Sequence, residues 1–280
     1  MSADDVSDLP RGNVRVQKAS VIWSVAAACL LLGSAVLQFL ASLQRWVVFR
    51  GSFGPEDVSA EDHRFDYDFP SEPWESIGTA AQFFGVGTFL QALGVLAIAF
   101  GVLLLSGEAG PRSDLISVVE MLLAAIVAAS FGFYGAHALV SGVTDVPSPL
   151  QYSWVSGLLG FPALIALGWL WRRKSRAATN ACVFLIGSTL GGYVVASTLI
   201  APIFAGYVSH DTTPWRETVV AVSTAIAGIT MLCAVGMADQ RLVTTYHRIR
   251  QSVLIVRGWA VVRFRCGFGS GPPVKGPPKV

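Results

Sequence analysis

Long apolar stretches dominate this sequence, and they constrain its fold more than any other feature. A helix needs about 17–25 mostly apolar residues to cross the hydrocarbon core of a bilayer, which is about 30 Å thick. Six stretches reach this length, at about residues 19–43, 78–105, 115–140, 153–171, 181–204 and 219–237. Only 14% of the residues are charged, against about 25% in a soluble globular chain. The sequence therefore predicts an integral membrane protein.

The apolar stretches are predicted to be α-helices. Backbone N–H and C=O groups inside a bilayer must be paired within the protein, which only helices and closed barrels achieve. Strands of a transmembrane barrel alternate apolar and polar residues over about ten positions, and these stretches are continuously apolar. We predict an all-α, polytopic membrane bundle of about six helices at 19–237, between a polar N-terminal tail at 1–18 and a basic tail at 238–280.

The first stretch, 19–43, is expected to stay in the protein as a membrane anchor. The apolar region of a signal peptide has about 7–15 residues, and this stretch is clearly longer. Cleavage near Ala41 is the alternative.

The basic residues indicate an orientation, because Lys and Arg accumulate in the cytoplasmic loops of membrane proteins. With the N-terminus inside, sixteen of the twenty basic residues fall on the cytoplasmic side, including the short cluster at 172–176. We therefore predict both termini in the cytoplasm and a multi-pass protein of the plasma membrane. Heavy use of Arg, Ala, Gly and Val hints at a GC-rich bacterial genome, and hence at a bacterial cell membrane.

Small residues at helical spacing predict where the helices pack, since they let helix backbones approach closely in a bilayer. Three such sets stand out: Gly87, Gly94 and Gly101; Ala125, Ala129 and Gly132; and Gly187 with Gly191.

A few polar residues inside the apolar stretches are candidates for a transport route. An ionisable side chain within a membrane helix is a functional candidate by default, and Glu120 is the clear acidic example. We add Gln91 and the polar face of the fifth helix, formed by Thr189, Tyr193 and Ser197. The alternatives are structural: Glu120 closes a capping box with Ser117, and Gln91, like Gln38, ties helices together by hydrogen bonds.

The outer loop, 44–77, is the largest polar segment between the apolar stretches. It carries eight acidic residues against three arginines, a net charge of −5, with aromatic residues between the acids. A solvated loop and a folded cap that binds a partner both fit this composition, and the aromatic content favours the cap. The candidates for partner binding are Asp62, His63, Asp66, Tyr67, Asp68 and Trp74.

The basic C-terminal tail, 238–280, is predicted to lie on the inner membrane surface. Apolar residues recur there at helical spacing among arginines, a pattern typical of an amphipathic segment on anionic lipid headgroups. The arginines are Arg241, Arg248, Arg250, Arg257, Arg263 and Arg265. Residues 262–265 also fit a strand, and the Gly- and Pro-rich end is predicted to be disordered. We do not expect the tail to bind nucleic acid.

The sequence contains no motif for a catalytic or cofactor site. Phosphate-binding, dinucleotide-binding, esterase and zinc-protease motifs are absent. Cys29, Cys182, Cys233 and Cys266 have no metal-ligand spacing, so we expect no metal, no cofactor and no enzymatic activity.

Two functional hypotheses follow, and an intramembrane enzyme is the weakest third. The first is an accessory or scaffold protein that binds another membrane protein, or a second copy of itself, through its acidic outer loop and basic inner tail. The second is a small-solute or ion-coupled permease that uses Glu120, Gln91 and the fifth helix. Sparse polar residues in the apolar stretches favour the first.

Overall fold

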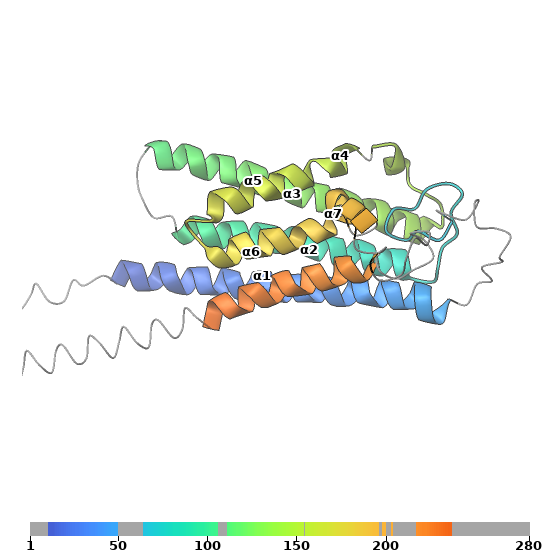
Figure 1. Cartoon of the computed structure of the whole chain (residues 1–280), viewed down its shortest axis with the longest axis horizontal. Helices are drawn as coiled ribbons and strands as arrows, with labels where there is room; N and C mark the ends of the chain where they lie inside the picture. The colour runs from blue at the N-terminus through green and yellow to red at the C-terminus, as the bar shows by residue number, and fades with distance from the viewer. Residues whose placement is uncertain are drawn as a thin grey trace, which may run out of the picture. The chain divides into compact units, whose positions relative to one another are not determined.

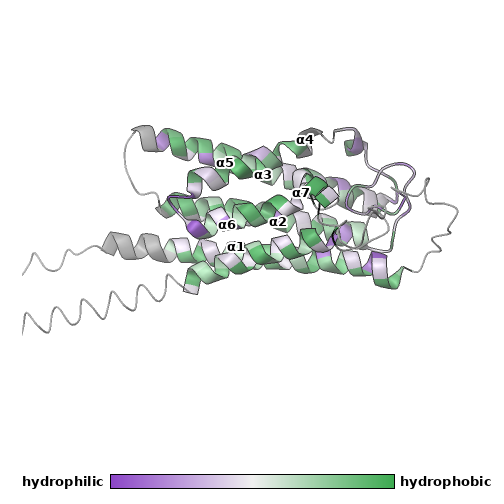
Figure 2. Cartoon of the chain, viewed as in Figure 1, coloured by the Kyte–Doolittle hydropathy of each residue, from purple (hydrophilic) through white to green (hydrophobic). Residues whose placement is uncertain are grey.

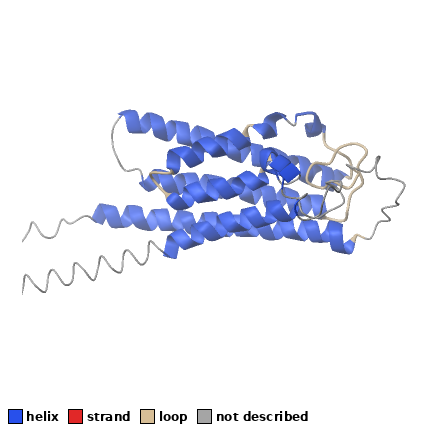
Figure 3. Cartoon of the chain, viewed as in Figure 1, coloured by secondary structure: helices blue, strands red, loops and turns tan. Residues whose placement is uncertain are grey.

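The computed structural model describes residues 11–49, 64–105, 111–153, 155–195, 198–199, 203 and 217–236. The chain divides into two compact units, Met1–Val235 and Gly236–Val280, and all described residues except Gly236 belong to the first. Most of these residues lie in helices, the others lie in turns and loops, and none lies in a strand (Figure 3). This part of the chain therefore has the predicted all-α fold.

Within the described part of the chain, four helices are long and apolar enough to cross a membrane, by length and composition. The helix α1 spans Arg11–Leu43 and continues as a π-helical turn, Gln44–Val48. It is followed by α2 at Ala80–Leu105 and α3 at Pro111–Thr144. The fourth is the unlabelled orange helix of Figure 1, Glu217–Gly236. Three of these helices, α1, α3 and the last, begin before the predicted apolar stretches, whereas α2 begins two residues after the start of its stretch.

The predicted fourth and fifth helices are interrupted. In place of 153–171 the chain forms a 3-10 turn at Pro149–Ser153, then α4 at Val155–Leu158 and α5 at Gly160–Trp171. Pro162 explains the step between α4 and α5, since proline has no N–H to donate to the carbonyl of Leu158. The structure therefore differs here from a single continuous helix.

The second interruption divides the predicted helix 181–204. Its helix α6 begins at Arg176 and ends at Leu185, a 3-10 turn follows at Ile186–Ser188, and α7 spans Leu190–Val195. Between them Thr189 is extended, with φ −97° and ψ 165°. Its hydroxyl accepts a hydrogen bond from Gly192 N–H at 3.2 Å, so Thr189 caps α7 and fixes the break.

Glycines set the packing of α2 against its neighbours. A Cβ at Gly94 would lie 2.9 Å from Leu31 of α1, and one at Gly87 would lie 3.1 Å from the carbonyl oxygen of Ser34. The predicted α2 seam is therefore an α1 contact. On α3, however, Ala125 and Ala129 are exposed, and the close approach to α2 uses Gly135 instead, whose Cβ would lie 2.9 Å from the Gly85 carbonyl oxygen.

The predicted Gly187–Gly191 seam is also wrong, because the chain is not helical between these residues. Gly187 lies against Ser223 of the last helix, whereas Gly191 lies against Phe161 of α5. Once the helix is interrupted, the two glycines no longer share a face.

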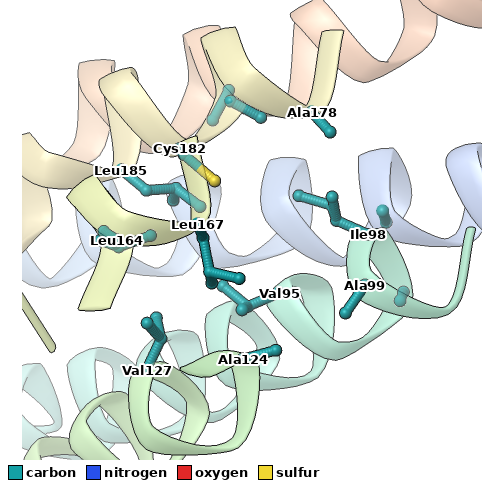
Figure 4. Close-up of a cluster of buried hydrophobic side chains, with 14 of the residues drawn as sticks. Val95, Ile98, Ala99, Ala124, Val127, Leu164, Leu167, Ala178, Cys182 and Leu185 are labelled. Carbon is teal, nitrogen blue, oxygen red and sulfur yellow. The ribbon is translucent and has the colours of Figure 1, made fainter. Parts of the chain in front are cut away.

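An apolar core joins α1, α2, α3, α5, α6 and the last helix. Its centre includes Val95, Val127, Leu164, Leu167 and Leu185, which converge from four helices (Figure 4). The long helices consist largely of apolar residues (Figure 2), and many of these side chains are exposed. Val36 is 58% exposed and Leu122 59% exposed, which is the arrangement expected of a surface that faces lipid.

Candidate functional site

The candidate site is a cavity of about 330 Å³ between α1, α2, α3, the break before α7 and the last helix. Four residues of the outer segment, which is the described part of the predicted outer loop at 64–77, also line it: Asp66, Asp68, Phe69 and Ser71. Its volume lies in the lower part of the range for small-molecule sites, about 300–1,000 Å³. The structure thus places a ligand-sized space where the sequence predicted continuous helices.

A pair of buried glutamines lines the deep part of the cavity. Gln38 Nε2 donates to Gln91 Oε1 at 2.8 Å and to Ser34 Oγ at 3.1 Å. Gln38 is 2% exposed and Gln91 1% exposed. Gln38 Oε1 and Gln91 Nε2 have no hydrogen-bond partner among the described residues, and a buried polar atom in that state costs about 1–3 kcal/mol. The pair therefore offers one acceptor and one donor to a bound molecule.

The pair still has one free acceptor and one free donor if the oxygen and nitrogen of each amide are exchanged. Exchanging O and N in both side chains reverses the shared hydrogen bond and still leaves one oxygen and one nitrogen unpaired. The predicted role of Gln91 as a tie between helices is correct, since Gln38 belongs to α1 and Gln91 to α2, but this bond uses only part of each amide.

The helix break forms a second wall of the cavity. Ser188, Thr189 and Leu190 line it, and the Ser188 hydroxyl lies 2.8 Å from Thr224 Oγ1 in the last helix. Thr189 Oγ1 donates to the carbonyl of Ile186 at 2.6 Å. Hydroxyl hydrogen bonds thus hold an irregular backbone beside the cavity, where irregular backbone is tolerated in a membrane protein.

A buried ion cluster holds the outer segment beside the cavity. Arg45 Nη1 lies 2.8 Å from Asp66 Oδ1 and 3.1 Å from Glu217 Oε1, and all three side chains are at most 6% exposed. This cluster joins the end of α1, the outer segment and the start of the last helix. The two carboxylates pair with the positive charge of the guanidinium, because a charge buried without a partner strongly destabilises a fold.

His137 fixes the outer segment on the α3 side. Its Nε2 lies 2.9 Å from the carbonyl oxygen of Pro70, and its Nδ1 lies 2.7 Å from Ser148 Oγ. The neighbouring Phe69 packs against both His137 and Tyr134, with ring centroids 4.5 and 6.0 Å apart. Phe69 and Tyr134 both line the cavity, so this contact forms an aromatic wall.

Glu120 lies away from the cavity. Its side chain is 1% exposed and its carboxylate oxygens lie 2.8 and 2.9 Å from Lys174 Nζ, after the end of α5. Along α3 the fourteen residues from Glu120 to Tyr134 correspond to about 21 Å. The predicted capping box is wrong, because α3 begins at Pro111 and Ser117 lies inside it.

Two of the predicted transport residues, Gln91 and Thr189, line the cavity together. Glu120 does not join them. The side chain of Tyr193 and all of Ser197 lie outside the described residues. The predicted continuous fifth helix is interrupted, with Thr189 in the break before α7.

The predicted partner-binding residues separate into three groups. Asp66 and Tyr67 are 3% and 2% exposed, so they contact the protein itself rather than its surroundings. Asp68 is half-buried and lines the cavity, and Trp74 packs against the apolar cluster under the outer segment. Asp62 and His63 lie outside the described residues, as do the six tail arginines.

The sequence analysis did not identify Thr88 or Ser188 as candidates. It did identify Asp68, but for partner binding rather than as part of a cavity wall. Only Gly187, Gly191 and Gly192 gave a signal, since three glycines within six positions weaken a helix by about 1 kcal/mol each.

In the described part of the chain, no three His, Cys, Asp or Glu side chains are grouped to hold a metal ion. Comparison with known proteins gives no match to a family model, to a curated protein or to a solved structure.

Proposed function

We propose that this chain is a multi-pass membrane protein that binds a small polar solute in its outer cavity, as a permease does. The observation that carries the proposal is the buried Gln38–Gln91 pair: both residues line a ligand-sized space, and the pair keeps one acceptor and one donor without a hydrogen-bond partner among the described residues. A packed scaffold has no need of such a pair, because each unpaired atom destabilises the fold. We expect the protein to act without enzymatic chemistry.

The interrupted helices support this proposal. Discontinuous membrane helices line the substrate sites of many secondary transporters, near the middle of the bilayer. Here the break at Thr189 lies against the same cavity as Gln91. It places the hydroxyl-bearing residues Ser188 and Thr189 in the cavity wall.

The proposal includes six crossings with both termini inside. The segments 155–171 and 176–195 would add the fifth and sixth crossings to the four long helices. Segment 155–171 would span about 25 Å as a helix. This length is short for a bilayer, but local thinning of the bilayer accommodates it. The basic cluster at 172–176 would then lie in the cytoplasm. The membrane would be a plasma membrane and, as the amino-acid composition hints, a bacterial one.

The accessory or scaffold hypothesis now has less support. Asp66 and Tyr67 are buried, so they present no surface to another protein or to a second copy. Contacts through Asp62, His63 or the tail arginines on anionic lipid stay predictions.

Cysteine accessibility tests the solute cavity. In a chain whose four native cysteines are replaced by Ser or Ala, Thr88→Cys places a near-isosteric thiol in the cavity wall. We expect small water-soluble methanethiosulfonates to modify it in the purified protein, as measured by mass spectrometry. Ala124→Cys is the matched control, because Ala124 is 0% exposed in the apolar core. Equal protection of both positions would mean that no solute reaches the cavity, and the proposal would be wrong.

A further inference from the structure

The cavity lining is acidic as well as polar. Asp66 and Asp68 line it, and no Lys or Arg is among its described lining residues. Arg45 sits behind Asp66, held by Asp66 and Glu217. The outer loop, 44–77, carries a net charge of −5 even when all its arginines are counted. An anionic solute would meet like charge on this path, and a cation would be attracted.

Aromatic rings line the same space. Phe69, Phe84 and Tyr134 are all lining residues, and Tyr67 packs edge-on against Phe84 with centroids 5.8 Å apart. The face of an aromatic ring carries partial negative charge, so it attracts a cation within about 6 Å of its centroid. Acids and rings together are the surroundings that suit an ammonium group rather than a hydrated metal ion.

The helix break also favours positive charge. The helix α6 and the 3-10 turn after it end at Ser188 and Thr189, which line the cavity. The C-terminal end of a helix carries a partial negative charge of about half a unit. The opposing end of α7 is weak, because α7 has six residues and Thr189 already accepts from its Gly192 N–H.

The amide pair adds a polar requirement. Gln38 Oε1 can accept a hydrogen bond and Gln91 Nε2 can donate one, and neither has a partner among the described residues, so a solute with a hydroxyl, or with an N–H and an acceptor, beside its charge would satisfy both. A purely apolar cation would leave both atoms unpaired.

From these observations, and resting on the proposed solute cavity, we infer that the ligand is a small organic cation: an amine or quaternary ammonium compound that also carries a hydrogen-bonding group.

The test uses charged thiol reagents at Thr88→Cys in the full chain without native cysteines. A trimethylammonium-ethyl methanethiosulfonate is compared with its sulfonate-ethyl counterpart of similar size. The control position is Ser76→Cys, which is exposed on the same acidic segment. The net negative charge of the loop acts at both positions, so its effect cancels when the two labelling ratios are compared. We expect the cation-to-anion ratio of labelling rates to be at least about tenfold higher at Thr88→Cys than at Ser76→Cys, which is modest for charges a few ångströms apart.

A second pair of variants tests whether the charge of the cavity lining causes the preference for the cationic reagent. Asp68→Asn removes a lining charge and should lower the ratio at Thr88→Cys several-fold. Asp145→Asn removes an exposed charge that does not line the cavity, and Asn tolerates the positive φ of 55° found there. It should leave the ratio unchanged.

Protection experiments identify the ligand class directly. Choline should slow the labelling of Thr88→Cys, whereas 3,3-dimethylbutan-1-ol, its uncharged isostere, should protect at least about tenfold less well.

The outcomes separate the two proposals. If both reagents label Thr88→Cys with the ratio seen at Ser76→Cys, or if the alcohol protects as well as choline, the cavity binds solute but the cationic class is wrong. If neither reagent reaches Thr88→Cys, the solute cavity itself is wrong.

Discussion

Glu120 and Lys174 form an ion pair whose two members differ in exposure. The carboxylate is 1% exposed and the lysine side chain 26% exposed. A charge at this depth is tolerated only if a partner neutralises it, and Lys174 reaches in from the chain between α5 and α6. The pair therefore ties α3 to that connection, which is a structural role for both residues.

Removing one member of this pair should destabilise the protein. We expect Lys174→Met to lower the free energy of unfolding by about 2–4 kcal/mol, because Glu120 is left buried without its partner. The double variant Glu120→Gln, Lys174→Met should recover most of the loss. Denaturant titration of the purified protein in detergent measures both.

The exposed pair Arg64–Glu75 supplies the control. Its side chains are 40% and 55% exposed, so Glu75→Gln should cost less than about 1 kcal/mol. Equal losses for Lys174→Met and Glu75→Gln would contradict the burial argument.

The sequence located Glu120 as an unusual residue but could not supply its partner. Lys174 lies 54 residues away, and its only visible role was in the basic cluster that sets orientation. Gln91 and Gln38 were recognised for the same reason as Glu120, polarity within an apolar stretch. Their meeting depends on the register of α1 against α2, which the glycine spacing suggests but does not fix.

At the scale of elements, the close crossing of α2 and α3 rests on two glycines. A Cβ at Gly85 would lie 2.8 Å from the carbonyl oxygen of Gly135 and 2.8 Å from the backbone nitrogen of Leu139. Backbone atoms cannot move aside as the end of a side chain can, so any larger residue must push the helices apart.

Gly85→Ala should therefore destabilise the protein by about 1–3 kcal/mol. The control is Gly132→Ala on α3, where a Cβ would lie 3.9 Å from Phe89. That variant should be neutral or stabilising by up to about 1 kcal/mol, because alanine favours helix over glycine. Thermal unfolding in detergent distinguishes them, and a stable Gly85→Ala would show that the helices do not cross this closely.

The interruptions show where hydropathy alone is insufficient. The four long helices were predicted because an apolar stretch of sufficient length has few alternatives in a bilayer. The breaks at 159 and 189 were missed because hydropathy does not register backbone hydrogen bonding. Pro162 and the glycines around Thr189 carried that information, so reading them as breaks rather than as packing residues would have found the cavity wall.

At the scale of the whole chain, the orientation of the bundle stays a prediction. With both termini inside, Ser76→Cys in intact cells should react with a membrane-impermeant thiol reagent, and Arg173→Cys should react only after permeabilisation. Both positions are exposed, and three basic residues remain in the cluster at 172–176 to hold the orientation. The reverse pattern of labelling would invert the topology.

The buried cluster around Arg45 joins residues that the ribosome makes at very different times. Asp66 follows Arg45 by 21 residues, whereas Glu217 follows it by 172. At about 5–20 residues per second, the ribosome needs roughly 10–30 s to make that intervening chain. Throughout this interval Arg45 at the end of α1 has Asp66 but not Glu217, and the walls at Ser188 and Val220 do not yet exist. The cavity is thus among the last features to form during biogenesis, and a nascent chain stopped before Glu217 would leave an open bundle without its last helix.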